Sequence, residues 1–125
     1  MLFYTYWAST ALLTLLYLSS AAFYIAKPEA VKKAQSDLGY SATNLIPFLI
    51  VIKILAPLAI VSRFNVGLSD LAYAGVFYHL LISALAHLGT KKPIGALPAA
   101  LGLFFLAASF LTQNAVRAIP SPYGL

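Results

Sequence analysis

The residue best placed to carry chemistry is a lysine inside an apolar run. Lys53 lies midway between Leu45 and Ser62, and that stretch holds no other charged residue. A run of this length is close to what crosses a hydrocarbon core about 30 Å thick, so Lys53 is predicted to lie near the bilayer midplane. A charge there costs about 3 kcal/mol on insertion scales and is usually retained because it faces a bundle interior, a wet cavity or a partner.

No acidic partner for Lys53 is evident. The acids of the chain are Glu29, Asp37 and Asp70, and all three fall in predicted loops or interfaces. The lysine is therefore predicted to be neutral, or to bind carbonyls, hydroxyls, water or a ligand. The structural alternative is a tolerated polar group, or a side chain whose stem reaches back to the interface.

Two histidines, a tyrosine and a serine complete the candidate ligand-binding set, which consists of Lys53, His79, Tyr17, Ser83 and His87. Lys53 and His79 are also candidate catalytic acid–base residues, since both are predicted near the middle of their spans. The alternative for His79 is a histidine bonded to hydroxyls on a facing helix, and His87 near an interface suits a wet structural role. The two histidines are two turns apart without a third ligand, so no metal site is predicted.

Composition excludes several classes of protein. Of the 125 residues, 62% are apolar and only 9% are charged, whereas soluble domains average about 25% charged residues. There is no cysteine, which removes disulfides, thiol redox chemistry and thiolate metal sites. No Gly-x-Ser-x-Gly element and no phosphate-binding loop occurs, so the sequence leans away from an enzyme. Apart from Lys53, the basic residues are scattered and lie mostly where apolar runs end, which is typical of membrane flanks and not of a nucleic-acid-binding surface.

Four apolar runs account for nearly the whole chain, at about residues 3–26, 44–62, 71–90 and 94–116. Runs this long and continuous are predicted to be spanning helices. Short links make sequential helices antiparallel, so residues 1–125 are predicted to form one all-α domain, an up-down four-helix transmembrane bundle. Residues 28–37 are predicted to form a short interfacial helix, because Pro28 suits a first helical position and Gly39 offers a stop.

Stripes of small and polar residues at helical spacing predict the inward faces of three spans. They consist of Tyr6, Thr10, Leu13, Tyr17, Ser20 and Tyr24 in the first; Ala72, Gly75, His79, Ser83 and Ala86 in the third; and Gly95, Ala99, Gly102, Leu106, Ser109 and Gln113 in the fourth. Trp7 and the tyrosines near helix ends, including Tyr4, Tyr6 and Tyr24, are predicted to form an aromatic belt.

The distribution of basic residues predicts the orientation. Lys27, Lys32, Lys33, Lys91 and Lys92 lie in the links after the first and third spans, and Arg63 and Arg117 lie on the opposite side. The lysine-rich side is predicted to be cytoplasmic and both termini non-cytoplasmic. In a bacterium the host membrane would be the plasma (inner) membrane.

Several segments resemble the DoxX-like family of small four-span membrane proteins, over about residues 6–110. These segments are Tyr6-Trp7-x-Ser9-Thr10, Ser20-Ala21, Pro28-Glu29, Leu38-Gly39-Tyr40, Lys53-Ile54-Leu55, Ala72-Tyr73-Ala74-Gly75 and a late His87. Ala86 departs from the serine expected before that histidine. The resemblance implies a four-helix transmembrane fold. Relatives include subunits of a thiosulfate:quinone oxidoreductase, redox-associated membrane proteins and an assembly chaperone for neurotransmitter receptors.

We therefore expect an integral membrane protein that binds a quinone, isoprenoid or lipid-like apolar ligand within the bundle near Lys53. No cofactor is certain. One alternative is an accessory subunit or assembly factor whose polar stripes meet another membrane protein or a second copy of the chain. The other is a small membrane enzyme that uses Lys53 and His79 as acid and base.

Overall fold

The computed structural model describes residues 1–37, 39, 45–62, 65–89, 91, 93–117 and 119–124. These residues form five α-helices and two short 3-10 helices and no strand. The α-helices are α1 (Leu2–Ala26), α2 (Pro28–Asp37), α3 (Leu45–Ser62), α4 (Val66–Gly89) and α5 (Leu97–Thr112). The 3-10 helices η1 (Pro93–Ala96) and η2 (Gln113–Ala115) extend α5 at its two ends.

A single residue, Lys27, links α1 to α2 and hydrogen-bonds to both helices. The amide of Lys27 donates to the carbonyl of Phe23 and closes α1, while the carbonyl of Lys27 accepts from the amide of Val31 and begins α2. Pro28 takes the first position of α2, where its missing N–H costs nothing. Gly39 follows α2 with a φ of 91°, a conformation that glycine adopts without strain. The predicted helix over residues 28–37 is thus confirmed, and its place at the membrane surface remains a prediction.

Helix α4 begins at Val66, five residues before the predicted span. The side-chain oxygen of Asn65 accepts from the amide of Leu68 at 2.9 Å, and its carbonyl accepts from the amide of Ser69. This capping extends the helix into what the sequence suggested was a link. Arg63, Thr90 and Lys92, which belong to the predicted links and flanks, lie outside the described residues, as do Leu38, Tyr40 and Asn44.

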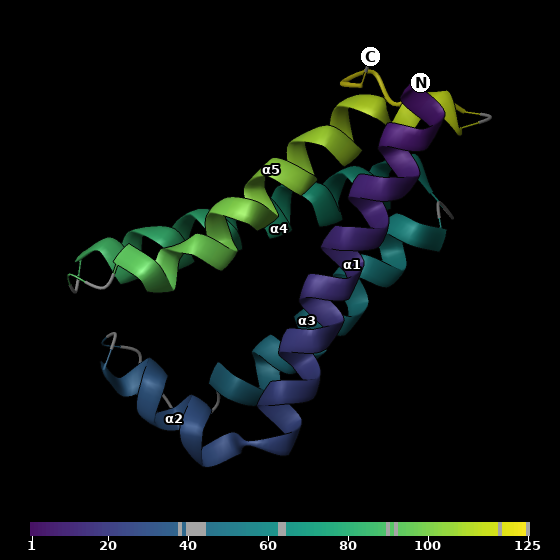
Figure 1. The fold of residues 1–125 in the computed structure, drawn as a ribbon. Coiled ribbons are helices and arrows are strands. Elements are labelled where there is room, and N and C mark those ends of the chain that lie inside the picture. The colour runs from purple at the N-terminus through teal and green to yellow at the C-terminus, as the bar shows by residue number, and fades with distance from the viewer. Residues whose placement is uncertain are drawn as a thin grey trace.

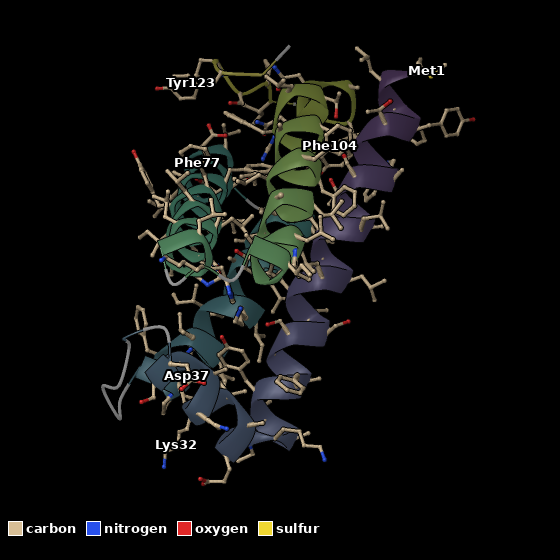
Figure 2. The ribbon with its side chains drawn as sticks, turned by 60° about the vertical axis from the view of Figure 1, so that its left-hand side comes forward. Met1, Lys32, Asp37, Phe77, Phe104 and Tyr123 are labelled. Atoms are coloured by element: carbon tan, nitrogen blue, oxygen red, sulfur yellow. The ribbon has the colours of Figure 1, made fainter. Side chains whose placement is uncertain are left out.

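The long helices pack in the cyclic order α1, α3, α4, α5, so that each contacts two others. Figure 1 shows successive long helices running in opposite directions, with the N-terminus and C-terminus close together at one end. Lys32 and Asp37 on α2 lie at the other end from Met1 and Tyr123 (Figure 2). The up-down order of the helices therefore agrees with the prediction.

Three helices are long and apolar enough to cross a membrane: Leu2–Ala26, Val66–Gly89 and Ile94–Ala115. The third of these combines η1, α5 and η2. Helix α3 is also apolar, but the part considered as a span, Ile46–Ser62, is shorter than these three. The spans shown by length and composition therefore number three among the described residues.

Most predicted inward residues are inward. In α1, Tyr6, Thr10, Leu13 and Tyr17 are buried, and in α5 the predicted face from Ala99 to Ser109 is buried. Tyr6, at 1% exposure, belongs to the core rather than to an aromatic belt. The predicted α4 stripe holds in part: Ala72, His79, Ser83 and Ala86 are half-buried, whereas Gly75 is exposed. The fully buried residues of α4 are Ser69, Tyr73, Val76 and Leu80.

Candidate functional site

A tyrosine and a histidine join α1 to α4 inside the bundle. The Tyr17 hydroxyl lies 2.7 Å from His79 Nδ1, and the two rings meet edge to face with centroids 5.6 Å apart. Tyr17 is buried at 2% exposure, so it fixes the imidazole from inside the core. Whichever group donates, Nε2 remains as the other hydrogen-bonding group of the His79 ring.

Lys53 is buried against aromatic rings. Its side chain is 5% exposed, and its ammonium lies 5.3 Å from the centroid of Tyr17 and 4.8 Å from that of Tyr24. Both distances fall within the range of a cation–π interaction, which is strongest where the cation is desolvated. Among the described residues no carboxylate forms an ion pair with Lys53, so the two rings are what the structure provides for its charge.

A cavity of about 390 Å³ opens beside this cluster, between α2 and the nearby parts of α1, α3 and α4. Its lining residues are Phe23, Tyr24, Val31, Ala34, Gln35, Leu49, His79, Ile82, Ser83, Ala86 and His87. Its volume lies within the 300–1,000 Å³ typical of ligand sites, and an apolar wall with a few polar groups is the usual composition of such sites.

The cavity gathers three of the five predicted ligand-binding residues, His79, Ser83 and His87, along one side of α4. The other two predicted residues, Tyr17 and Lys53, do not line the cavity. Tyr17 reaches the cavity through its contact with His79, and Lys53 through its contact with Tyr24. Direct contact between Lys53 and a ligand therefore stays a prediction.

Gln35 on α2 is a polar wall residue that the sequence reasoning missed. Its Nε2 donates to the Tyr24 hydroxyl at 3.2 Å, while its Oε1 is buried without a hydrogen-bond partner in the described structure. The side chain is 8% exposed. Val31 and Gln35 are the buried residues of α2 and lie four apart, which was the available signal for a face turned toward the bundle.

His87 is held in place by the backbone of η1. A Cβ added at Gly95 would overlap the imidazole ring of His87, so the ring packs on a surface that only glycine provides. This fixes the imidazole at the wall of the cavity. The described residues contain no group of three His, Cys, Asp or Glu side chains that could hold a metal ion.

Another interior polar cluster joins the hydroxyls of three residues to one another. Ser109 in α5 lies 2.6 Å from both the Thr10 and the Tyr73 hydroxyls, and it is 0% exposed. These three hydroxyls satisfy one another across α1, α4 and α5. The cluster is therefore a packing device of the kind that joins membrane helices.

A wider groove of about 700 Å³ runs along α4 and α5. Its wall includes the exposed side chains Phe77, Tyr78 and Leu111, and none of the predicted site residues contributes to it. Asp70 at one end is engaged by the Ser121 hydroxyl at 2.9 Å. An apolar surface of this kind is what a lipid-facing flank requires, so the smaller cavity is the better candidate site.

No curated protein and no solved structure matches the chain. The DoxX-like family matches residues 8–110, which is most of the chain. Together with the three apolar helices, this match indicates a small integral membrane protein. The chain belongs to the DoxX-like family.

Proposed function

We propose that this protein binds an apolar, lipid-like molecule in the cavity between α2 and the bundle. The observation that carries the proposal is the cavity itself, because His79, Ser83 and His87 meet there with Gln35 on a largely apolar wall. An apolar wall would hold a hydrocarbon body, and the four polar side chains would orient a head group. Quinones, isoprenoids and lipids all combine an apolar hydrocarbon body with a more polar head group.

The proposal includes a fourth span. Helix α3 has 18 residues and would extend about 27 Å, close to the thickness of a hydrocarbon core. It packs against α1 and α4, which are long enough to cross. Lys53 on α3 is buried in the bundle, so the charge need not meet lipid. These features support a bundle in which α3 crosses the bilayer as well.

Lys53 has a supporting role in this proposal. Its ammonium holds the rings of Tyr17 and Tyr24, and Tyr24 in turn contacts Gln35. One cation thus contacts Tyr24, which lines the cavity, and Tyr17, which bonds the lining residue His79. Lys53 is a positioning residue, and the head group meets α2 and α4.

The test is the content of the purified protein. The protein is reconstituted in nanodiscs of defined lipid, and bound apolar molecules are extracted and identified by mass spectrometry. The matched pair of variants is Ala86→Phe, which fills the cavity, and Ala100→Phe, which places the same ring on an exposed position of α5. We expect one retained molecular class in the native protein and in Ala100→Phe, and its loss in Ala86→Phe.

The alternatives appear as different outcomes of the same preparation. A protein that co-purifies in fixed ratio while no small molecule is retained would favour an accessory subunit or assembly factor. Turnover of a retained molecule that disappears in Lys53→Met or His79→Gln would favour a membrane enzyme. Equal retention by both phenylalanine variants would contradict binding in this cavity.

A further inference from the structure

We infer that the head group of the ligand is uncharged and carries a hydrogen-bond donor, such as the hydroxyl of an alcohol or phenol. The inference rests on the proposed function and specifies the chemical class of its ligand. It makes Gln35 the residue that determines specificity. The family membership does not point to this side chain.

The first ground is the absence of charge on the described cavity wall. No lysine, arginine, aspartate or glutamate lines it, and Tyr24 stands between it and the buried ammonium of Lys53. An ionised phosphate or carboxylate would lose its hydration there without meeting a counter-ion at contact distance. Burial of an unpaired charge costs far more than burial of a hydrogen-bonded hydroxyl.

The second ground is the carboxamide of Gln35. With Nε2 donating to the Tyr24 hydroxyl, the remaining atom is Oε1, an acceptor without a partner in the described structure. A buried acceptor left unsatisfied costs free energy that an incoming donor recovers. A ketone, ester or ether head offers only acceptors and cannot satisfy it, whereas a hydroxyl can.

The third ground is the arrangement of the opposite wall. Ser83, His79 and His87 on α4 each carry a group that can accept or donate, according to hydroxyl rotation or imidazole tautomer. A hydroxyl donates to Gln35 and still accepts from α4, so one head group satisfies both walls. Oε1 is buried, so ligand binding must include a small shift of the Gln35 side chain that exposes Oε1 and keeps Nε2 on the Tyr24 hydroxyl.

The experiment compares three probes with the same apolar body, 4-octylphenol, 4-octylanisole and 4-octylbenzoate. Native mass spectrometry from nanodiscs counts probe bound to protein separately from probe dissolved in lipid. The native protein should bind the phenol about tenfold more tightly than the anisole, because the methyl ether lacks the donor. The benzoate should bind most weakly.

Gln35→Leu is the matched variant, since it keeps the volume of the side chain and removes the acceptor. It should bind the phenol and the anisole equally, at about the level of the anisole on the native protein. Ser36→Leu, at an exposed position of the same helix, should retain the preference. Circular dichroism on each variant establishes that the helices are kept.

Each contrary result has a distinct meaning. Equal binding of phenol and anisole by the native protein would overturn the donor requirement and leave the cavity as a binding site. Strongest binding of the benzoate would overturn the uncharged head group and assign Lys53 as its counter-ion. Binding of none of the three probes would contradict the proposed function itself, and with it this inference.

Discussion

Replacement of Lys53 by methionine separates the charge of this residue from its packing. Methionine keeps an unbranched apolar stem of similar length and removes the ammonium. With α3 spanning the bilayer as proposed, Lys53 carries a midplane charge that costs about 3 kcal/mol on insertion scales, and its removal would recover that amount. Two desolvated cation–π contacts, at 5.3 Å to Tyr17 and 4.8 Å to Tyr24, would be lost, at about 2 kcal/mol each.

A methionine sulfur near the same rings would return about 1 kcal/mol. The opposing contributions nearly cancel, so we expect the unfolding free energy of Lys53→Met to lie within about 1 kcal/mol of the native value. Lys53→Ala removes the stem as well and leaves a void, and it should be about 2 to 3 kcal/mol less stable than Lys53→Met. The difference between the two variants isolates packing from charge.

The assay is reversible unfolding in mixed micelles, combined with phenol-probe binding in nanodiscs on the same preparations. Since Lys53 stands behind Tyr24, affinity for the probe should fall by less than tenfold in Lys53→Met. Complete loss of binding with unchanged stability would refute the positioning role and place the ammonium in contact with the ligand. A loss of stability far above 1 kcal/mol would show that the ring contacts do not account for the stabilisation of this charge.

Four further predictions concern contacts around the bundle. Tyr17→Phe leaves His79 Nδ1 without its 2.7 Å partner and should cost about 1 kcal/mol in unfolding free energy and weaken probe binding, whereas Tyr4→Phe at an exposed position should change neither. Ser109→Ala leaves two buried hydroxyls without their partner and should lower the unfolding free energy by about 1 to 2 kcal/mol, with Ser19→Ala as the exposed control. Equal losses in the two variants would show that the hydroxyl cluster does not stabilise the core. Gly95→Ala should lower the thermal unfolding temperature by displacing the His87 ring, while Gly75→Ala, where no atom lies within 4 Å, should be neutral or slightly stabilising. Single cysteines at Lys32 and Lys91 should resist an impermeant maleimide in intact cells and one at Tyr123 should react, and the opposite labelling pattern would invert the orientation.

The sequence predicts the buried faces of α1 and α5 correctly, because most small and polar residues of the predicted stripes in these helices are also buried. In α1 and α5 the small and polar residues recur at helical spacing and do face the interior, because hydroxyls in a membrane bundle need partners on other helices. In α4 the same rule failed at Gly75. Small residues are tolerated on either face, and here Tyr73 and Val76 supply the bulk that fills the core.

The composition of the site was harder to predict than the fold. His79, Ser83 and His87 were predicted to bind a ligand from their residue types, and the structure places all three on the wall of one cavity. Their role in binding stays a prediction. The ring partners of Lys53 are Tyr17 and Tyr24 of α1, which both belong to the predicted inward stripe. Their contacts with a lysine on α3 depend on how the two helices pack, which the sequence does not show. Gln35 was missed because α2 was considered only as a surface helix, although its buried Val31 and Gln35 turn toward the bundle.

Photolabelling tests the central claim most directly, because it reports where an apolar ligand resides. The probe is a 4-alkylphenol with a diazirine in its alkyl chain, activated in nanodiscs and mapped by peptide mass spectrometry. Binding in the cavity predicts adducts on Ala34 and Gln35 of α2 and on residues 82–87 of α4, with competition by unlabelled 4-octylphenol. Adducts confined to the α4–α5 groove around Phe77 and Leu103, or spread without competition over all exposed apolar side chains, would contradict a ligand site between α2 and the bundle.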